Sequence, residues 1–233
     1  MQQIKNAIIM AAGAGTRLQP YTLDTPKSLL KVNGKPVIES LIETLKAKHI
    51  DDITIITGYL REHFSYLKYK YMVNIVYNPW WVHTNNISSL YVARKYLSCT
   101  LIMDADQIIY DPSVIPTDIE HSGYLCYYTD KRIAEWGLTL NDENKIIYAK
   151  REFAEKNFAL QSVSAWTKED TSMLKRYLQK VFIRKYSDRY WDDIAMFIHP
   201  ENFALYGYPI EKNAIVEFDT VEEYERILQN EKT

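Results

Sequence analysis

The feature that most constrains this chain is a short apolar run near its start, which passes directly into a glycine-containing loop. Residues 7–12 read Ala-Ile-Ile-Met-Ala-Ala, and Gly13 and Gly15 follow. A short, continuous apolar run ended by a glycine is typical of a strand that is buried on both faces. Glycines let the backbone turn sharply and bring its N–H groups close to a phosphate. Because Arg17 and Lys27 can add positive charge, the sequence predicts a phosphate-binding loop at the end of a buried strand.

Strand and helix patterns alternate along the first half of the chain. Residues 36–50 carry an apolar stripe at helical spacing, with Pro36 where a first helical turn tolerates it. Such alternation predicts an α/β fold, with a Rossmann-like, mostly parallel sheet flanked by helices, whose ligands sit beyond the carboxyl ends of the strands. We expect strands at 7–12, 52–57, 73–77 and 100–103, and helices at 36–50, 60–70 and 87–97.

The pattern changes after Asp106 to shorter aromatic strands, near residues 123–128, 138–140 and 160–166, followed by a helix at 169–182. A chain of 233 residues fits one domain, or one domain with an inserted lobe. We therefore interpret residues 1–233 as a single domain. Its core comprises residues 1–122 and about 204–233, and residues from about 123 to 203 form a small mixed α/β lobe.

Composition and charge exclude some classes of partner. The net charge of −2 and a pI of about 6.2 argue against a nucleic-acid partner, which normally requires a basic surplus. The N-terminal apolar run is too short to span a membrane and ends in charge. Cys99 and Cys126 lie in apolar surroundings and are expected to be small buried side chains. These observations predict a soluble, cytoplasmic protein without a membrane partner.

The N-terminal motif resembles that of nucleotidyltransferases that join a nucleoside triphosphate to a phosphorylated small molecule. That family has Ala-Ala-Gly-x-Gly-x-Arg followed by Pro-Lys. This chain matches it with Ala11-Ala12-Gly13-Ala14-Gly15-Thr16-Arg17 and Pro26-Lys27. The resemblance implies that residues 12–16 (Ala12, Gly13, Ala14, Gly15 and Thr16) wrap the triphosphate. It further implies that Lys27 contacts the α-phosphate, while Arg17 is expected to stabilise the departing pyrophosphate.

A second chemical signal is the pair of carboxylates in Asp104-Ala-Asp106, at the end of the buried strand 100–103. In the resembling family the second aspartate binds Mg²⁺, so Asp106 is implied as a metal ligand and catalytic residue. Relatives carry Asn at the next position, where this chain has Gln107, so the role of that side chain is open. The resemblance implies Glu217 and Asp219 as further metal ligands. Alternatively, Asp219 or Thr220 caps the helix expected at 221–230.

Several segments in the middle of the chain resemble bacterial phosphocholine cytidylyltransferases. A trimethylammonium group has no N–H to donate, so proteins bind it with aromatic faces and a nearby negative charge. In the expected acceptor-binding lobe, Trp136 and Tyr190 can supply the faces and Asp192 the charge; alternatively, each ring is an ordinary core aromatic. We interpret Trp80, Trp81 and Trp166 as structural. The matching segments are Ala134-Glu135-Trp136, Ser162-Val-Ser-Ala-Trp166, Tyr190-Trp191-Asp192, Gly58-Tyr59-Leu60, Asn85-Asn86 with Ser89-Leu90-Tyr91, and Glu217-Phe218-Asp219.

Base recognition is expected from the turn after the third strand and the start of the following helix. Asn86 and Ser89 match the family's base-reading positions, and Gly58 belongs to the nucleotide-binding set that the resemblance implies. Asn or Ser can bond a cytosine edge through its donors and acceptors. Asn86 could equally cap the helix, and both interpretations stay open.

The sequence thus predicts a Mg²⁺-dependent cytidylyltransferase that converts CTP and phosphocholine into CDP-choline and pyrophosphate. The expected partners are CTP and a phosphorylated small molecule, and a homo-oligomer is left open. One alternative is a nucleotidyltransferase that acts on 2-aminoethylphosphonate, phosphoethanolamine or a sugar 1-phosphate, with CTP or another nucleoside triphosphate. The other is a non-catalytic nucleotide-binding relative, although such a protein has no need to keep Arg17, Lys27 and Asp106 together.

Overall fold

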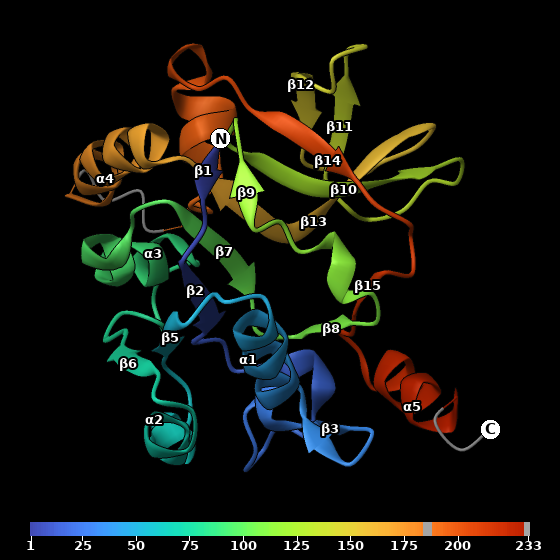
Figure 1. Cartoon of the computed structure of the whole chain (residues 1–233). Helices are drawn as coiled ribbons and strands as arrows, with labels where there is room; N and C mark the ends of the chain where they lie inside the picture. Colours follow the sequence, from blue (N-terminus) through green and yellow to red (C-terminus); the bar gives the residue numbers. More distant parts are fainter. Residues whose placement is uncertain (184–187, 231–233) are drawn as a thin grey trace.

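The computed structural model describes residues 1–183 and 188–230, and within them nine strands form one central sheet with helices on both faces (Figure 1). The sheet order is β12-β11-β13-β7-β2-β5-β6, while β10 pairs with β13 and β14 pairs with β10. β2 is parallel to β5 and β7, and β5 is parallel to β6. The predicted α/β fold is confirmed. The strands are β2 Asn6–Ala11, β5 Asp52–Thr57, β6 Asn74–Tyr77, β7 Thr100–Asp104, β10 Gly123–Thr129, β11 Gly137–Leu140, β12 Ile146–Lys150, β13 Asn157–Trp166 and β14 Tyr206–Pro209.

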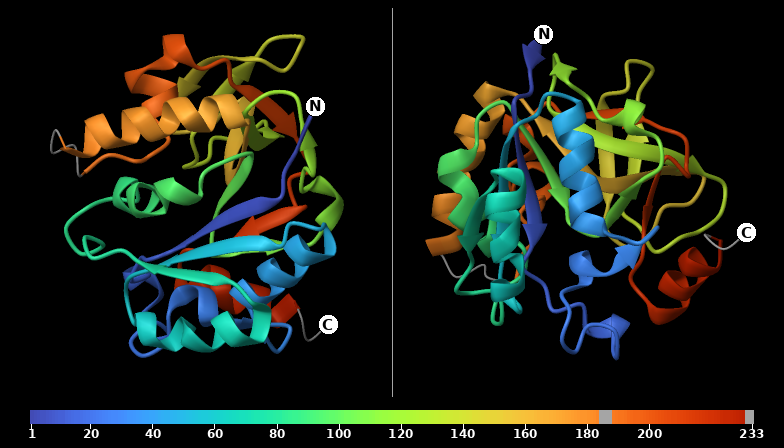
Figure 2. Two further views of the ribbon diagram at one scale, coloured as in Figure 1. Left: turned by 60° about the vertical axis from the view of Figure 1, so that its left-hand side comes forward. Right: turned by 60° about the horizontal axis from the view of Figure 1, so that its bottom comes forward.

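Helices cover the two faces of the parallel strands (Figure 2). Successive side chains of a strand point to opposite faces, so Ile9 packs with α1 (Val37–Ala47) and α2 (Ser65–Tyr71). Ile8 packs on the other face with α3 (Ile87–Ala93) and α4 (Lys168–Ile183). This burial on both faces explains the continuous apolar run in the sequence. No helix in the described ranges has both the length and the apolarity needed to cross a bilayer.

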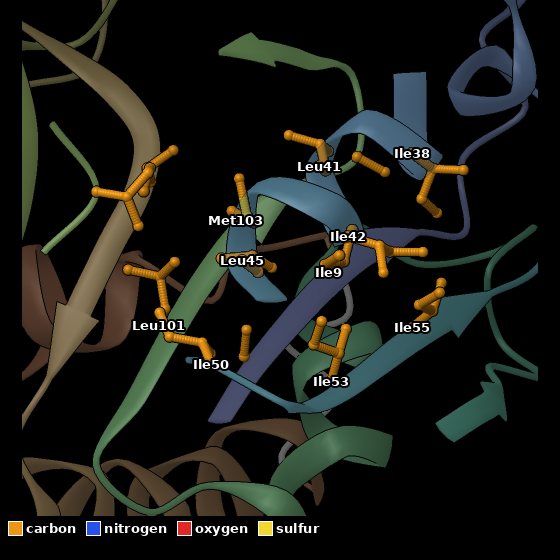
Figure 3. Close-up of a cluster of buried hydrophobic side chains, with 14 of the residues drawn as sticks. Ile9, Ile38, Leu41, Ile42, Leu45, Ile50, Ile53, Ile55, Leu101 and Met103 are labelled. Carbon is orange, nitrogen blue, oxygen red and sulfur yellow. The ribbon is translucent and has the colours of Figure 1, made fainter. Parts of the chain in front are cut away.

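Helix α1 contributes the apolar stripe that the sequence predicted. Its buried side chains Ile38, Leu41, Ile42 and Leu45 pack against strands β2, β5 and β7 (Figure 3). The helix ends at Ala47, three residues before the end of the predicted range. α1 therefore fixes the position of β2, whose carboxyl end starts the glycine loop.

Two predicted helices are shorter than expected. The segment predicted as a helix at 60–70 starts with a tight turn, Arg61–Phe64, before α2. The segment predicted at 87–97 leaves the α-helical form after Ala93 and continues as a tighter turn, Arg94–Tyr96. The Arg94 guanidinium donates a hydrogen bond to the Tyr91 carbonyl oxygen at 2.6 Å, in competition with the next helical backbone bond.

Within the described residues, three short two-stranded ladders lie outside the central sheet, and the sequence analysis missed all of them. In one of these, β8 (Gln107–Ile109) pairs antiparallel with β15 (Ile215–Glu217), so that Gln107 stands opposite Glu217. This pairing brings the C-terminal acidic segment beside Asp106. The others join β1 (Gln2–Gln3) to β9 (Asp118–Ile119) and β3 (Lys31–Val32) to β4 (Lys35–Pro36). Helix α5 spans Val221–Asn230.

The second half of the chain extends the same sheet. Strand β13 pairs antiparallel with β7 on one side and with β10 on the other, and β12 and β14 add strands that the sequence analysis did not predict. A π-helical turn, Ile194–Ile198, lies between α4 and β14 in the chain. Residues 184–187 of the predicted lobe lie outside the described residues, and the division into core and lobe stays a prediction.

Shortening one α1 core side chain should destabilise the fold measurably. Leu45→Ala removes a fully buried side chain and should lower the free energy of unfolding by about 2–5 kcal/mol, because the surrounding core collapses only partly. Ser40→Ala, at an exposed position of the same helix, should change it by less than about 0.5 kcal/mol. Urea denaturation measures both, and equal effects would contradict the packing role of α1.

Candidate active site

A cavity of about 400 Å³ lies at the carboxyl ends of the parallel strands, where ligands of open α/β sheets bind. Ala14, Thr16 and Gly58 are not among the lining residues in the described part of the chain, and their roles stay predictions. Most of the predicted site residues do line the cavity: Ala12, Gly13, Gly15, Arg17, Lys27, Asn86, Ser89, Asp106, Glu217 and Asp219.

Gly13 and Gly15 occupy their positions in the loop for different structural reasons. Gly15 has φ +61°, and a Cβ there would lie 3.1 Å from Lys27 Cβ and 3.3 Å from Thr22 Cγ2. The Thr22 hydroxyl donates a hydrogen bond to the Gly15 carbonyl oxygen at 2.8 Å. Glycine therefore lets the loop fold tightly against the residue that carries the site's ammonium group. A Cβ on Gly13 would meet nothing within 4 Å, so Gly13 leaves open space in the cavity.

Gly58 packs closely against the glycine loop and Trp81. A Cβ at this position would lie 2.5 Å from the Ala12 carbonyl oxygen and 2.6 Å from Trp81 Cγ. The Tyr59 backbone N–H donates to the same Ala12 oxygen at 3.0 Å, which ties the end of β5 to the glycine loop. Trp81, which the sequence analysis interpreted as structural, lines the cavity. That interpretation is incomplete, because the ring forms part of the wall as well as packing on Gly58.

Three carboxylates converge at one end of the cavity. Asp106, Glu217 and Asp219 each offer an oxygen, and these oxygens lie within 4.8 Å of one another. Asp106 Oδ1 is buried and has no hydrogen-bond partner in residues 1–183 and 188–230. Since Mg²⁺ takes hard oxygen ligands from one or two carboxylates together with substrate phosphates, the donor set fits a divalent metal ion.

Gln107, whose role the sequence left open, orients one of these carboxylates. Its side chain is fully buried, and Nε2 donates a hydrogen bond to Glu217 Oε2 at 2.8 Å. Burial, with added repulsion from Asp106 and Asp104, raises the pKa of Glu217 well above its ordinary value. The amide thus holds in place a carboxylate that is costly to ionise until a cation is present.

Lys27 provides positive charge beside the carboxylates. Its ammonium group forms an ion pair with Asp106 and contacts Asp219 Oδ1 at 2.7 Å; Arg17 Nη2 lies 2.9 Å from the same Asp219 oxygen. Burial alone would lower the pKa of Lys27, but Asp106 and Asp219 outweigh it and the pKa is raised. Burial likewise opposes ionisation of Asp219, but its contacts with Lys27 and Arg17 lower its pKa. The cluster therefore holds a protonated lysine against carboxylates.

The structure shows which residue caps α5, a choice between Asp219 and Thr220 that the sequence left open. The Glu223 backbone N–H donates to Thr220 Oγ1 at 3.3 Å, and the Glu223 carboxylate accepts from the Thr220 backbone N–H at 3.0 Å. This reciprocal pair is a capping box. Thr220 is thus the capping residue, and the Asp219 side chain is directed to Lys27 and Arg17.

Amide and hydroxyl groups also line the cavity. Asn86 Oδ1 accepts a hydrogen bond from the Trp191 backbone N–H at 3.0 Å, and its side chain makes no cap bond to α3. Asn78 Nδ2 donates to Ser88 Oγ at 2.7 Å and to Ser89 Oγ at 3.1 Å. The sequence analysis missed Asn78; its place directly after a predicted strand was the available signal.

The structure brings together two of the three predicted acceptor residues. The rings of Trp136 and Tyr190 meet edge to face, with centroids 5.5 Å apart. Asp192 instead accepts a hydrogen bond from the Tyr124 hydroxyl at 2.9 Å and lines a small cavity of about 30 Å³. Asp104 lines both this cavity and the larger one, so Asp192 lies beside the nucleotide-binding edge of the sheet.

The environment of Asp192 makes its carboxyl group harder to ionise than that of an ordinary aspartate. Burial raises its pKa to about 7, although the bond from Tyr124 acts in the opposite direction. Sequence analysis missed Tyr124, a fully buried ring on β10. Trp166 is fully buried, as its structural interpretation predicts, and its Nε1 donates to Ser164 Oγ at 2.9 Å.

Comparison with known proteins gives the family. The model of the MobA-like NTP transferase domain matches residues 7–180. The choline-phosphate cytidylyltransferase of Streptococcus pneumoniae is 37% identical over 97% of this chain and 99% of its own length. The 2-aminoethylphosphonate cytidylyltransferase of Lancefieldella rimae is 34% identical over 94% of this chain and 89% of its own length.

A solved structure agrees with these relatives. The CTP:phosphocholine cytidylyltransferase from Streptococcus pneumoniae superposes with a TM-score of 0.92 at 35% identity, and the match covers 100% of both chains. Together with the glycine loop and the Lys27–carboxylate cluster, these matches place the chain in the MobA-like NTP transferase family, and the protein is a nucleotidyltransferase.

Proposed function

We propose that the protein is a Mg²⁺-dependent phosphocholine cytidylyltransferase, which converts CTP and phosphocholine into CDP-choline and pyrophosphate. The observation that carries the proposal is the cluster of Lys27 with Asp106 and Asp219 in the cavity that the Gly13 loop borders. It supplies mobile positive charge and oxygen ligands where a triphosphate would enter. The names of the relatives from S. pneumoniae support this choice of nucleotide and acceptor.

The proposed reaction needs positioning and charge neutralisation rather than a strong base. An anionic oxygen of phosphocholine forms a bond to the α-phosphorus of CTP in line with the bond that breaks, and pyrophosphate leaves with the bonding pair. Lys27 would move from the carboxylates to the α-phosphate, and Arg17 would bind the departing pyrophosphate. Asp106, Glu217 and Asp219 would hold Mg²⁺, which supplies charge neutralisation at the phosphates.

For the acceptor, we propose that Trp136 and Tyr190 face the quaternary ammonium group and that Asp192 adds negative charge. The edge-to-face contact of the two rings supports an aromatic surface in the segment 123–203. Asn86 and Ser89, which line the same cavity, are the proposed base-reading residues. We further propose a cytoplasmic enzyme, in keeping with the free thiols of Cys99 and Cys126.

A primary-amine acceptor such as 2-aminoethylphosphonate is the second candidate. Asp104 and Asp192 line one small cavity, and carboxylates suit an ammonium group that has N–H donors. The L. rimae relative carries that activity in its name. The candidates are distinguished by an assay of pyrophosphate release. Each of four nucleoside triphosphates is tested with phosphocholine, 2-aminoethylphosphonate, phosphoethanolamine and a sugar 1-phosphate. A preference for UTP or dTTP with a sugar 1-phosphate would overturn the proposal.

Substitutions of the two glycines should separate binding from folding. Gly13→Val places a branched side chain in open space, so it should abolish CTP binding and leave the melting temperature nearly unchanged. Gly58→Ala collides with the Ala12 backbone and Trp81, and it should lower the free energy of unfolding by about 1–3 kcal/mol. Calorimetric titration with CTP and thermal melting measure the two effects, and a strongly destabilised Gly13→Val would contradict the assignment.

Loss of one metal ligand should affect turnover more than nucleotide binding. Asp106→Asn removes a carboxylate charge from the cluster and should lower kcat by about 100-fold or more, equivalent to about 2.7 kcal/mol. Asp142→Asn, in an exposed turn, is the matched control and should keep the wild-type rate. A rate for Asp106→Asn within a few-fold of the control, at saturating Mg²⁺, would remove Asp106 from the metal site.

Substitutions of the proposed acceptor residues should discriminate between phosphocholine and 2-aminoethylphosphonate as the substrate. A desolvated cation–π contact is worth up to about 2 kcal/mol, so Trp136→Ala should raise the KM for phosphocholine by roughly thirtyfold. The KM for CTP should hardly change, and Trp136→Phe should recover part of the loss. If the enzyme prefers 2-aminoethylphosphonate, Asp192→Asn should cost more than Trp136→Phe. Wild-type preference for the primary amine, with Trp136→Ala harmless, would reject the choline acceptor.

A further inference from the structure

A connecting segment, residues 19–26, joins the glycine loop to Lys27. It lies between the short helical turns Thr16–Leu18 and Lys27–Leu29 and belongs to no helix or strand. Arg17 precedes the connecting segment and Lys27 follows it, so its conformation sets the spacing of two cationic side chains that line the nucleotide cavity. A segment without regular structure is ordered by contacts from outside itself.

Tyr59, two residues after the end of β5, supplies such contacts before and after the glycine loop. Its hydroxyl group lies 2.9 Å from the Thr22 carbonyl oxygen and 2.7 Å from that of Leu23, so the phenol proton is shared between the two. Its backbone N–H donates to the Ala12 carbonyl oxygen at 3.0 Å, at the start of the glycine loop. One residue therefore ties the end of β2 to the connecting segment.

Thr22 carries this contact on to the glycine loop. Its side chain is fully buried, and its hydroxyl group donates to the Gly15 carbonyl oxygen at 2.8 Å, while its own carbonyl oxygen accepts from Tyr59. The Tyr59 ring also meets the Trp81 ring edge to face, with centroids 5.8 Å apart. The phenol, the threonine and the loop glycine thus form one chain of hydrogen bonds, which ends at a residue that lines the cavity.

We propose that Tyr59 is a positioning residue for nucleotide binding, which holds the glycine loop and the connecting segment in the conformation that receives a triphosphate. Tyr59 is not among the lining residues in the described part of the chain, so it acts through Thr22 and Gly15. A loop that is already ordered binds its ligand more tightly, because less conformational entropy is lost on binding. The inference rests on the proposed function in one respect, that the triphosphate of CTP binds beside this loop.

Two tyrosine-to-phenylalanine variants test the proposal. Tyr59→Phe removes the shared phenol bond and keeps the ring against Trp81. Tyr208→Phe is the matched control, because its hydroxyl group also donates to a backbone carbonyl, that of His121, and Tyr208 is not among the described lining residues of the nucleotide cavity. Both variants should lower the melting temperature by about 2–4 °C. Calorimetric titration should show CTP binding at least fivefold weaker in Tyr59→Phe and changed less than twofold in Tyr208→Phe, and equal affinities in the two variants would overturn the proposal.

Hydrogen exchange of the ligand-free proteins tests the positioning role without any nucleotide. The backbone amides of residues 13–26 should exchange at least threefold faster in Tyr59→Phe than in Tyr208→Phe, while those of β2 and β5 should match in the two variants. Equal exchange in residues 13–26 would overturn the positioning role even if CTP binding were weaker. A wild-type protein that does not bind CTP would reject the proposed function, and the exchange result would still decide whether Tyr59 holds the loop.

A third variant tests the route through Thr22. Thr22→Val keeps the shape of the buried side chain but removes the hydrogen bond to Gly15, so it should also weaken CTP binding. Because both substitutions interrupt one chain of hydrogen bonds, the Tyr59→Phe/Thr22→Val double variant should lose less affinity than the product of the two single losses. A loss equal to that product would overturn the route through Thr22.

Discussion

The ion cluster of Lys27 with Asp106 and Asp219 is the interaction on which the rest of the site depends. Its members come from three distant parts of the chain: the turn after the glycine loop, the end of β7 and the segment after β15. Carboxylates this close repel one another unless a cation lies between them. The fold meets this need with the protonated ammonium group of Lys27.

The central sheet makes this convergence possible. Strands β2, β5, β6 and β7 run parallel, so the residues after them collect at one edge. The glycine loop follows β2, Gly58 follows β5, Asn78 follows β6 and the acidic pair ends β7. Helices on both faces bury the strands, so side chains at that edge are held by a rigid core. The β8–β15 ladder then adds Glu217 and Asp219 from the far end of the chain.

Residues that the sequence analysis missed mostly act through other residues. Gln107 holds Glu217, Asn78 holds Ser89, and Tyr124 donates to Asp192. An amide or a phenol in such a place has no pattern of its own in the sequence, because its partner lies 11, 68 or 110 residues away along the chain. Thr220 is different, because the sequence analysis already named it as a possible cap: the spacing of Thr220 and Glu223 is a local capping signal, and both hydrogen bonds of the capping box form.

By itself, the sequence determined the buried first strand, the glycine loop, the alternation of strands and helices and the carboxylates after β7, because each depends on neighbouring residues and on a short period of apolar side chains. Only the tertiary structure decided which carboxylates share a cation, that Asn86 bonds to Trp191 and not to its own helix, and that Trp81 lines the cavity. It also paired Asp192 with the Tyr124 hydroxyl and the ring of Trp136 with that of Tyr190. These outcomes depend on strand pairings such as β8 with β15 and β13 with β7, which join segments far apart in the chain and which no local pattern encodes.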